Sequence, residues 1–412
     1  MHDRYRNNYL ITAIILCGGY FIDFYNLTIF AVGYPELIKD LFSQTDPISI
    51  QQTRIFITNC QTLGIFFGAI VFGSLGDKLG RTAIIRYSIL IYSIAIFSSI
   101  FIHSVWLFGL VFFVVGFGLA TEFATSNVLI SELLPTEISS KISGYIYTCG
   151  VLGGLSVIML DFISWKIMFL GGAFGGLILF SLRKLLNESP VFLKLSKNVH
   201  SGNLFKLVNS KAKLLKLLKL TLLIVPFNLL ISIMFVFPNY MHLHYDLAYA
   251  TKILLLGFFM GNIISAIASS YIVNYTKSYR PYLYISYIGF LILVPLVPLI
   301  TDHSLLIYSI GIGLLGGGLP TVWMLLTNRS FGTNQRNLAS NSLFALGRLS
   351  NIGFNLLLGI ALASYAHHLY IIMLVVNLMI IGCAIYSLKN TQNNFNSDID
   401  FVEASVPLDR DL

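Results

Sequence analysis

Long apolar runs alternate with short polar segments along almost the whole chain. Most runs reach about 20 residues or more, the length that an α-helix needs to cross a bilayer. The pattern predicts an all-α integral membrane protein with twelve transmembrane helices. The predicted spans cover residues 8–36, 52–76, 82–102, 106–134, 140–162, 165–186, 215–241, 247–275, 281–301, 304–329, 337–364 and 367–389.

One connection is longer and more polar than the others. It lies between the sixth and seventh predicted spans and carries five lysines within residues 187–214. We therefore divide the chain at this segment. The predicted parts are an N-terminal six-helix bundle over 1–186, a basic cytoplasmic linker over 187–214, a C-terminal six-helix bundle over 215–389 and a polar cytoplasmic tail over 390–412.

The two halves also show a weak internal repeat. Gly116 and Gly311 lie 195 residues apart, within the fourth and tenth spans, and Lys141 and Arg336 have the same separation. Parallel repeats of this kind place a binding site between two bundles near the middle of the membrane. We expect two parallel six-helix repeats with such a site.

Spans two and eight both carry glycines four residues apart. The pairs are Gly64 with Gly68 and Gly257 with Gly261. Small residues at this spacing let two membrane helices approach closely. We therefore expect a structural role for both pairs, in helix packing.

Composition and charge support a membrane protein and set its orientation. The chain is 56% hydrophobic and 11% charged, whereas soluble domains average about 25% charged residues. With both termini in the cytoplasm, only Lys39, Arg54, Lys166 and Lys252 fall in outer loops, as the positive-inside rule requires. The net charge of +8 is therefore typical of basic cytoplasmic loops. We expect a monomer in the lipid bilayer of the cell (inner or plasma) membrane, with no nucleic-acid partner.

A short charged stretch interrupts the apolar pattern after the second span. Gly73 to Arg81 reads G-S-L-G-D-K-L-G-R. Glycines permit a tight turn, and charged side chains are costly at the bilayer centre. The stretch is therefore predicted to be a hairpin at the membrane surface.

This hairpin resembles the signature of the major facilitator superfamily, G-x-x-x-D-(R/K)-x-G-R-(R/K). The matching residues are Gly73, Asp77, Lys78, Gly80 and Arg81, and Thr82 departs from the pattern. In a chain with twelve predicted spans, the match identifies the protein as similar to this superfamily.

Three further segments are similar to the metabolite:proton symporter and sugar porter group. The end of span four resembles G-F-x-x-G-G-E…E-x-x-P, E-S-P follows span six, and D-F-Y-N-L-T-I-F in span one resembles E-W-Y-D-F-x-I-Y. The residues that carry these matches are Gly116, Glu122, Glu132, Pro135, Glu188 and Asp23. Other positions depart from the group: its span-four arginine falls on Phe112, the basic residue after the span-four proline on Glu137, and an acid of the second half on Arg329.

The resemblance implies a secondary active transporter that works by alternating access. We expect proton-coupled uptake of a small polar metabolite, such as an organic acid, an amino acid or betaine, or a sugar-like compound. The alternatives are a proton-driven exporter of a metabolite or drug-like compound and a non-transporting membrane sensor. The chain has no nucleotide-binding, zinc-protease or nucleophile-elbow motif, which lowers the prospect of an enzyme. We expect no metal and no cofactor other than the proton gradient.

Ionisable residues deep in the spans are functional candidates because burying them is costly. Asp23 and Glu122 are the predicted proton-coupling residues, since desolvation favours a protonated carboxyl group. Each also has a structural alternative, as a carboxylate held by a fixed partner. Arg348 is predicted to bind a substrate carboxylate, to pair with one of these acids, or to extend toward the cytoplasmic surface.

Several polar or aromatic residues in the spans are candidates for the substrate site. Each has the alternative of bonding a neighbouring helix. The candidates are Tyr25, Asn26, Asn127, Asn228, Asn262, Trp323, Arg348 and Asn351.

A second group of charged residues and glycines lies at the predicted cytoplasmic ends. The resemblance implies a cytoplasmic gate, closed by ion pairs between the halves, and the alternative is a solvated rim with little energy per pair. The members are Gly73, Asp77, Lys78, Gly80, Arg81, Glu132, Glu188, Arg329 and Arg336.

Overall fold

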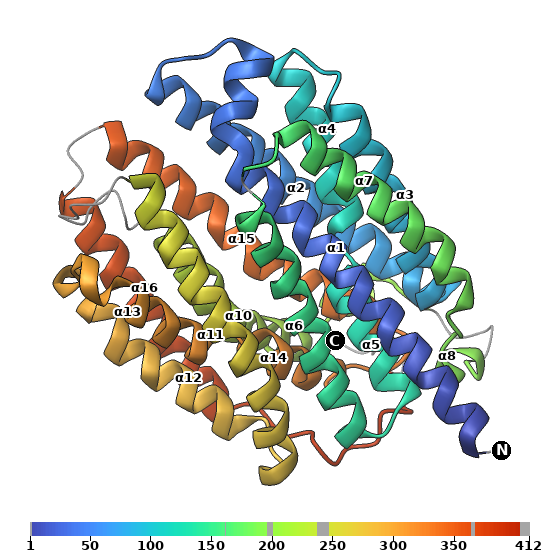
Figure 1. The fold of residues 1–412 in the computed structure, drawn as a ribbon. Helices are drawn as coiled ribbons and strands as arrows, with labels where there is room; N and C mark the ends of the chain where they lie inside the picture. The colour runs from blue at the N-terminus through green and yellow to red at the C-terminus, as the bar shows by residue number, and fades with distance from the viewer. Residues whose placement is uncertain (1, 161, 196–200, 237–246, 364–366, 404–412) are drawn as a thin grey trace, which may run out of the picture.

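The computed structural model describes residues 2–160, 162–195, 201–236, 247–363 and 367–403, and these are helical with short connections (Figure 1). The helices are α1 (His2–Phe42), α2 (Pro47–Leu79), α3 (Arg81–Ser99), α4 (Val105–Leu119), α5 (Glu122–Leu133), α6 (Thr136–Met159), α7 (Trp165–Leu182), η1 (Arg183–Leu185), α8 (Pro190–Leu193), α9 (Leu204–Val208), α10 (Lys211–Val236), α11 (Leu247–Thr276), α12 (Arg280–Leu293), η3 (Val294–Leu299), α13 (Asp302–Gly316), α14 (Leu319–Asn328), α15 (Arg336–Ala363) and α16 (His367–Lys389).

Eight helical segments of the described residues are long and apolar enough to cross a membrane, and two shorter apolar helices accompany them. The prediction of an all-helical membrane fold is confirmed, while the predicted number of twelve spans is not tested by the described residues. Several boundaries differ. α1 continues through Pro35 to Phe42, and α10 begins at Lys211 rather than at 215. The predicted span ends at 241 and 364 lie outside the described residues.

Two of the predicted spans are discontinuous. Span four, predicted as one helix, is divided into α4 and α5 at Ala120 and Thr121, and span ten is divided into α13 and α14 at Gly317 and Gly318. At the second break a side chain is excluded, because a Cβ on Gly318 would lie 2.3 Å from Ser269 Cβ. The freed Gly318 N–H donates to the Tyr282 hydroxyl at 3.0 Å. Polar side chains thus satisfy backbone groups that the break exposes.

Close helix pairs rest on glycines at corresponding places. A Cβ on Gly64 would lie 2.0 Å from Phe113 O, so α2 and α4 touch through their backbones. In α11 and α13, a Cβ on Gly261 would lie 2.3 Å from Ile310 O. The structure corrects the sequence repeat: Gly313, with its Cβ position 2.3 Å from Phe258 O, makes the backbone contact that Gly116 makes in α4, whereas Gly311 faces only the Leu293 side chain.

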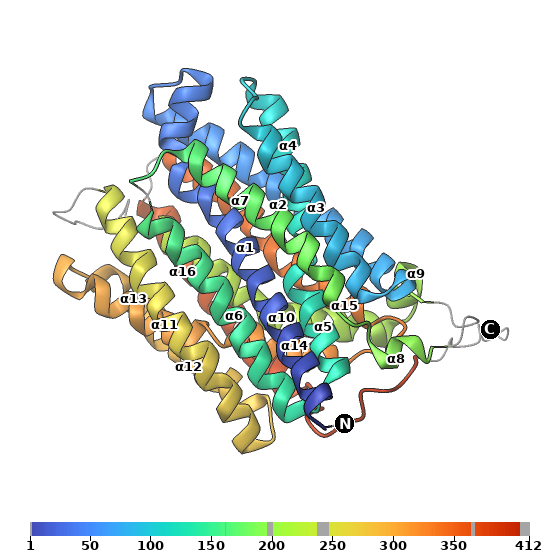
Figure 2. The same cartoon turned by 45° about the vertical axis from the view of Figure 1, so that its right-hand side comes forward.

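Helices α1–α7, named the N-terminal set, pack mainly on one another, and α10–α16, the C-terminal set, do the same. The sets meet most extensively at two helix pairs, α2 with α15 and α6 with α11. We call these pairs the α2–α15 seam and the α6–α11 seam. The end of the bundle where α2 ends and α15 begins is called the gate face. Figure 2 shows α8 and α9 at this end, near the beginning of α1.

Candidate functional site

A group of buried charges lies within the N-terminal set. Asp23 on α1 is 1% exposed, and its Oδ1 atom has no hydrogen-bond partner among the described residues. Its carboxyl group interacts electrostatically with Glu122, Arg348 and Arg183. Asp23 therefore faces charges from both helix sets, without a direct ion pair to a described residue.

Glu122 is held by Arg183, a residue that the sequence interpretation did not single out. Arg183 Nη2 lies 2.5 Å from Glu122 Oε1, and both side chains are fully buried. The guanidinium also donates to the Ile85 carbonyl. Arg183 follows directly on α7, near the predicted membrane surface, where a basic residue is common. The only signal for this region in the sequence is the E-S-P motif, which begins at Glu188. Glu122 thus has a buried arginine as its direct partner.

Gly19 on α1 lies directly against this ion pair. A Cβ at this position would lie 2.2 Å from Arg183 Nη2 and 2.4 Å from Glu122 Oε1. Any side chain at Gly19 would displace one of the two charged groups. The glycine therefore lets α1, which carries Asp23 one helical turn further on, approach the Glu122–Arg183 pair.

Arg348 on α15 is partly exposed and stacks on an aromatic ring. Its Cζ atom lies 4.5 Å from the centroid of the Phe344 ring, a cation–π distance. It forms no ion pair with a described residue, while it interacts electrostatically with Asp23 and with Tyr20 of the N-terminal set. Arg348 is thus a positive charge without a described carboxylate in direct contact.

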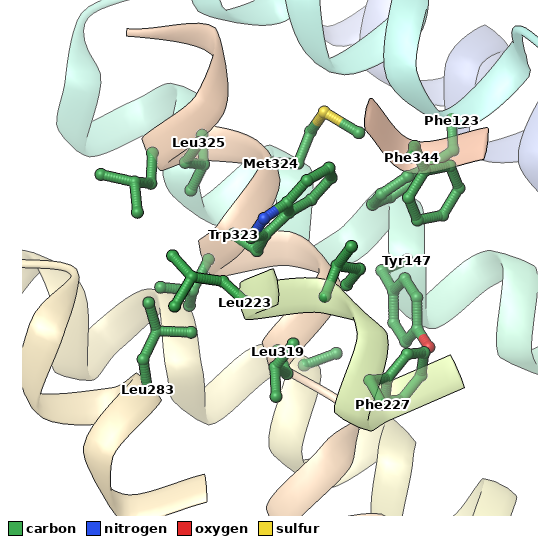
Figure 3. Close-up of a cluster of buried hydrophobic side chains, with 14 of the residues drawn as sticks. Phe123, Tyr147, Leu223, Phe227, Leu283, Leu319, Trp323, Met324, Leu325 and Phe344 are labelled. Carbon is green, nitrogen blue, oxygen red and sulfur yellow. The ribbon is translucent and has the colours of Figure 1, made fainter. Parts of the chain in front are cut away.

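An aromatic layer lies beside Arg348. Phe344 is 5.2 Å from Phe123 and 6.0 Å from Trp323, measured between ring centroids, and Phe123 is 5.7 Å from Tyr147. Figure 3 shows these rings side by side, with residues from both helix sets. The layer thus joins α5 and α6 of the N-terminal set to α14 and α15 of the C-terminal set through aromatic contacts.

The other substrate candidates mostly bond their own helix set. Tyr25 donates to Met168 O at 3.1 Å and Asn26 to Gly172 O at 3.4 Å, so both face α7. Trp323 Nε1 donates to Leu220 O at 2.7 Å. These contacts match the structural alternative, in which each residue fastens two helices.

The asparagine candidates occupy different surroundings. Asn127 and Asn228 donate to the carbonyls four residues before them. Asn262 packs against Gly317 at the break between α13 and α14, and its Oδ1 has no partner among the described residues. The Oδ1 of Asn351, one turn beyond Arg348, is also without such a partner. The Oδ1 of Asn127 likewise lacks a described partner, so Asn127, Asn262 and Asn351 all retain free hydrogen-bonding capacity.

At the gate face, one carboxylate joins two arginines from opposite sets. Glu132 Oε1 lies 3.0 Å from Arg81 Nη2 and 2.6 Å from Arg336 Nη1, and all three side chains are fully buried. Arg81 also donates to the Thr333 carbonyl of the C-terminal set at 2.8 Å. This arrangement connects α3, α5 and α15, and it must break if the gate face opens.

Asp77 caps a helix of the opposite set. Its carboxylate accepts from the backbone N–H groups of Asn337 at 3.1 Å and Leu338 at 2.9 Å, at the beginning of α15. A carboxylate is favourable there because the first N–H groups of a helix lack intrahelical partners. Gly73 and Gly76 allow this approach, since a Cβ on Gly76 would lie 2.0 Å from Asn337 Nδ2.

The remaining members of the predicted gate have other roles. Glu188 accepts from the backbone N–H groups of Arg81 and Thr82, at 3.1 and 3.0 Å, and so caps α3 within the N-terminal set. Gly80, with φ of +105°, makes room for this carboxylate. Lys78 is exposed and forms no ion pair with a described residue.

Two of the sequence departures, Glu137 and Arg329, contact the opposite helix set at or beside the α6–α11 seam. Glu137, where the group has a basic residue, pairs with Lys277 across the seam, and both side chains are about half exposed. Asn274 donates to Glu137 O at 2.9 Å and accepts from Ser140 at 2.8 Å. Arg329, where the group has an acid, donates to Thr136 Oγ1 at 2.6 Å. The departures are matched by new partners.

The structure has two helix sets, a polar network that joins them at one face, and buried charges near their contact. This arrangement is typical of multi-pass membrane transporters. A family model described as Major Facilitator Superfamily matches residues 16–354. The chain belongs to this superfamily, which is a family of transporters and not a class of enzymes.

Relatives agree on the class and differ in what their names say they carry. The chain is 28% identical to the benzoate transport protein of Acinetobacter baylyi over 194 residues, 45% of this chain and 39% of that protein. It is 29% identical to a Haemophilus influenzae protein named "Putative metabolite transport protein" over 135 residues, 32% of this chain and 33% of that protein. The matches thus span well under half of these relatives.

The fold also corresponds to that of a solved transporter. The proton:xylose symporter XylE, bound to 6-bromo-6-deoxy-D-glucose, superposes with a TM-score of 0.75 at 15% sequence identity. The superposition covers 95% of this chain and 97% of that structure. At this identity the correspondence concerns the fold.

Proposed function

We propose that the protein is a proton-coupled symporter that imports a small organic carboxylate by alternating access. In this proposal twelve helices form two six-helix bundles, residues 1–186 and 215–389, with both termini and the gate face in the cytoplasm. The protein works as a monomer in the cell membrane, with the proton gradient as its energy source and no metal or cofactor.

The observation that carries the proposal is the unequal surroundings of the two deep acids. Glu122 forms an ion pair with Arg183 at 2.5 Å, whereas Asp23 is equally buried and forms no ion pair with a described residue. Each of the two carboxylates has one oxygen without a described hydrogen-bond partner, so the counter-ion is what distinguishes them. A desolvated carboxyl group without a counter-ion favours its protonated form. Asp23 is therefore the proton carrier, and Glu122 with Arg183 is a fixed pair beside it.

The choice of a carboxylate rests on Arg348. Its guanidinium lies between the helix sets without a described carboxylate partner, and Arg binds carboxylates through paired N–H donors. The rings of Phe344 and Phe123 beside it suit a substrate with an apolar body. The name of the Acinetobacter baylyi relative, a benzoate transport protein, agrees with this chemistry and makes benzoate a reasonable first probe.

The test is transport of radiolabelled benzoate by protein reconstituted into liposomes. In Asp23→Asn we expect pH-driven accumulation to be lost while exchange of external for internal benzoate continues, because the asparagine cannot carry a proton. Asp40→Asn is the matched control on the same helix, since the Asp40 side chain is 46% exposed. It should accumulate benzoate normally.

Three outcomes separate the parts of the proposal. Full accumulation by Asp23→Asn would exclude Asp23 as the carrier. Accumulation of an uncharged sugar but not of benzoate would contradict the role of Arg348. Loading of everted vesicles by an imposed proton gradient would indicate an exporter.

A further inference from the structure

The segment that follows α16 lies across the gate face. Figure 1 shows it in red, along the end of the bundle where α6 begins. Phe395 is 2% exposed and packs on the Tyr279 ring at 5.6 Å between centroids. Arg280 donates to the Thr391 carbonyl. The beginning of this segment is therefore anchored on the loop between α11 and α12.

Further along, three alternate residues present their carbonyl groups to the loop between α14 and α15. Ser397 O accepts from Arg329 Nη1 at 2.6 Å, Ile399 O accepts from Arg336, and Phe401 O accepts from Thr333 N at 2.8 Å. The segment is not a regular strand, since it bends at Ser397 and Ile399, but each of these carbonyl groups, two residues apart, meets a donor of the C-terminal set. The register of the segment thus matches the three acceptors to three donors.

The three donors, Arg329, Thr333 and Arg336, lie in this loop or at its ends, and each also contacts the N-terminal set. Arg329 donates to Thr136, Arg336 pairs with Glu132, and the Thr333 carbonyl accepts from Arg81. Three residues of the C-terminal set therefore each bind a carbonyl group of the segment on one side and a residue of the N-terminal set on the other. These contacts hold the two sets together at the gate face.

The end of the segment is fixed to the same loop. Glu403 N donates to Asn334 Oδ1 at 3.0 Å, and Asn334 Nδ2 donates to Glu403 O at 3.2 Å. The Glu403 carboxylate lies 3.5 Å from Lys213 Nζ at the beginning of α10. These hydrogen bonds and ion pairs of residues 391–403 connect them to the C-terminal set, so the segment positions the gate residues rather than bridging the sets itself.

We propose that residues 391–403 are a strap that holds Arg329, Thr333 and Arg336 in the orientation needed to close the gate face. The strap occupies guanidinium donors that the N-terminal set leaves free, and it fixes a loop that lies between α14 and α15. Because its gate partners are held through backbone carbonyls, the strap acts through register more than through charge. The protein's own C-terminal segment thereby sets the balance between the conformations closed and open at this face.

The test measures the distance between the helix sets, which needs no substrate. Spin labels are attached through Leu79→Cys at the end of α2 and Tyr275→Cys at the end of α11, both exposed, after replacement of the native cysteines. Removal of residues 391–412 should raise the ratio of open to closed populations roughly tenfold, since several charged hydrogen bonds disappear. This appears as a shift of the distance distribution to longer values. Removal of 404–412 alone should leave the distances unchanged.

A variant that retains the segment tests its register. Asp400 is exposed, and deletion of this one residue moves the Phe401 carbonyl out of line with Thr333 N. We expect an intermediate shift toward the open distances. Asp400→Ala keeps the register and is the matched control, with no expected change. A synthetic peptide of residues 391–403, added to the truncated protein, should restore part of the closed population.

The result that would overturn the strap is an unchanged distance distribution in the 391–412 truncation, with the protein monodisperse in detergent. An equal effect of Asp400→Ala and of the deletion would also contradict it, because register would then be irrelevant. If the truncated protein does not fold, the Asp400 pair alone decides the question.

Discussion

The two seams that join the helix sets at the gate face are built from different chemistry. At the gate face, the α2–α15 seam is flanked by Arg81 on α3, Glu132 on α5 and Arg336 on α15, with all three side chains inaccessible to solvent. The α6–α11 seam is joined by close backbone approach at Gly144 and by Ser270, which donates to Ser140 O at 2.9 Å. Its ion pair among the described residues, between Glu137 and Lys277, lies at the exposed rim.

This difference assigns different roles to the seams. Buried charges are stable only while they are paired, so the α2–α15 seam is either closed with its pairs complete or open with the charges in water. Small side chains and backbone contacts have no such requirement, and the α6–α11 seam can slide or tilt with little electrostatic cost. The α2–α15 seam is therefore the expected switch, and the α6–α11 seam the expected pivot.

The largest expected effect is at Glu132. Glu132→Gln leaves Arg81 and Arg336 buried without their shared carboxylate, and removal of one partner from a buried ion pair costs about 3–5 kcal/mol. The closed conformation should therefore be largely lost. The distance between spin labels at Leu79→Cys and Tyr275→Cys measures this as a shift to longer values.

The control for that experiment is a carboxylate on the other seam. Glu137→Gln makes the same chemical change at a rim position and should leave the distances at their original values. Equal shifts in the two variants would mean that the α2–α15 seam is not the switch.

A smaller effect is expected from steric change at the pivot. A Cβ on Gly144 would lie 2.4 Å from Ser270 Oγ and 2.8 Å from Ala266 O. Because one neighbour is backbone, Gly144→Ala must move α6 away from α11, and such overpacking costs about 1–3 kcal/mol. The measurement is a lowered melting temperature in detergent together with a broader distance distribution.

Gly382→Ala on α16 is the matched control, since no described atom lies within 4 Å of its Cβ position. It should melt at the original temperature or slightly above, because alanine favours a helix more than glycine does. If Gly144→Ala also melted at the original temperature, the stability of the protein would not depend on the close contact between α6 and α11.

Much of the fold was accessible from the sequence because the bilayer imposes a strong length and polarity rule. The apolar runs predicted the helices, and the glycine pair at Gly64 and Gly68 predicted the close contact of α2. The breaks inside spans four and ten were missed, because each span is apolar enough over its whole length to be predicted as one helix. Their stabilising partners, such as Tyr282 for Gly318, come from another helix and have no local signal.

The candidate site was predictable in parts. The hairpin motif led to Asp77 and Arg81, but not to the backbone of α15 that Asp77 caps. Arg183 was missed because it lies at a predicted helix end, where a basic residue is common. Its partner Glu122 is 61 residues earlier in the chain. Likewise, the polar composition of the C-terminal tail gave no indication that its carbonyl groups lie against Arg329 and Arg336.

The smallest expected effect concerns the rim pair of the α6–α11 seam. Lys277→Gln and Glu137→Gln each remove one exposed charge, and exposed pairs are weakened by solvent and salt. Neither variant should change the distances, and any change in melting temperature should disappear at high salt. The double variant Glu137→Lys with Lys277→Glu restores an opposite-charge pair and should match the original protein even at low salt. A marked opening in either single variant, reversed by the exchange, would show that the rim pair also closes the gate, and the division into switch and pivot would no longer hold.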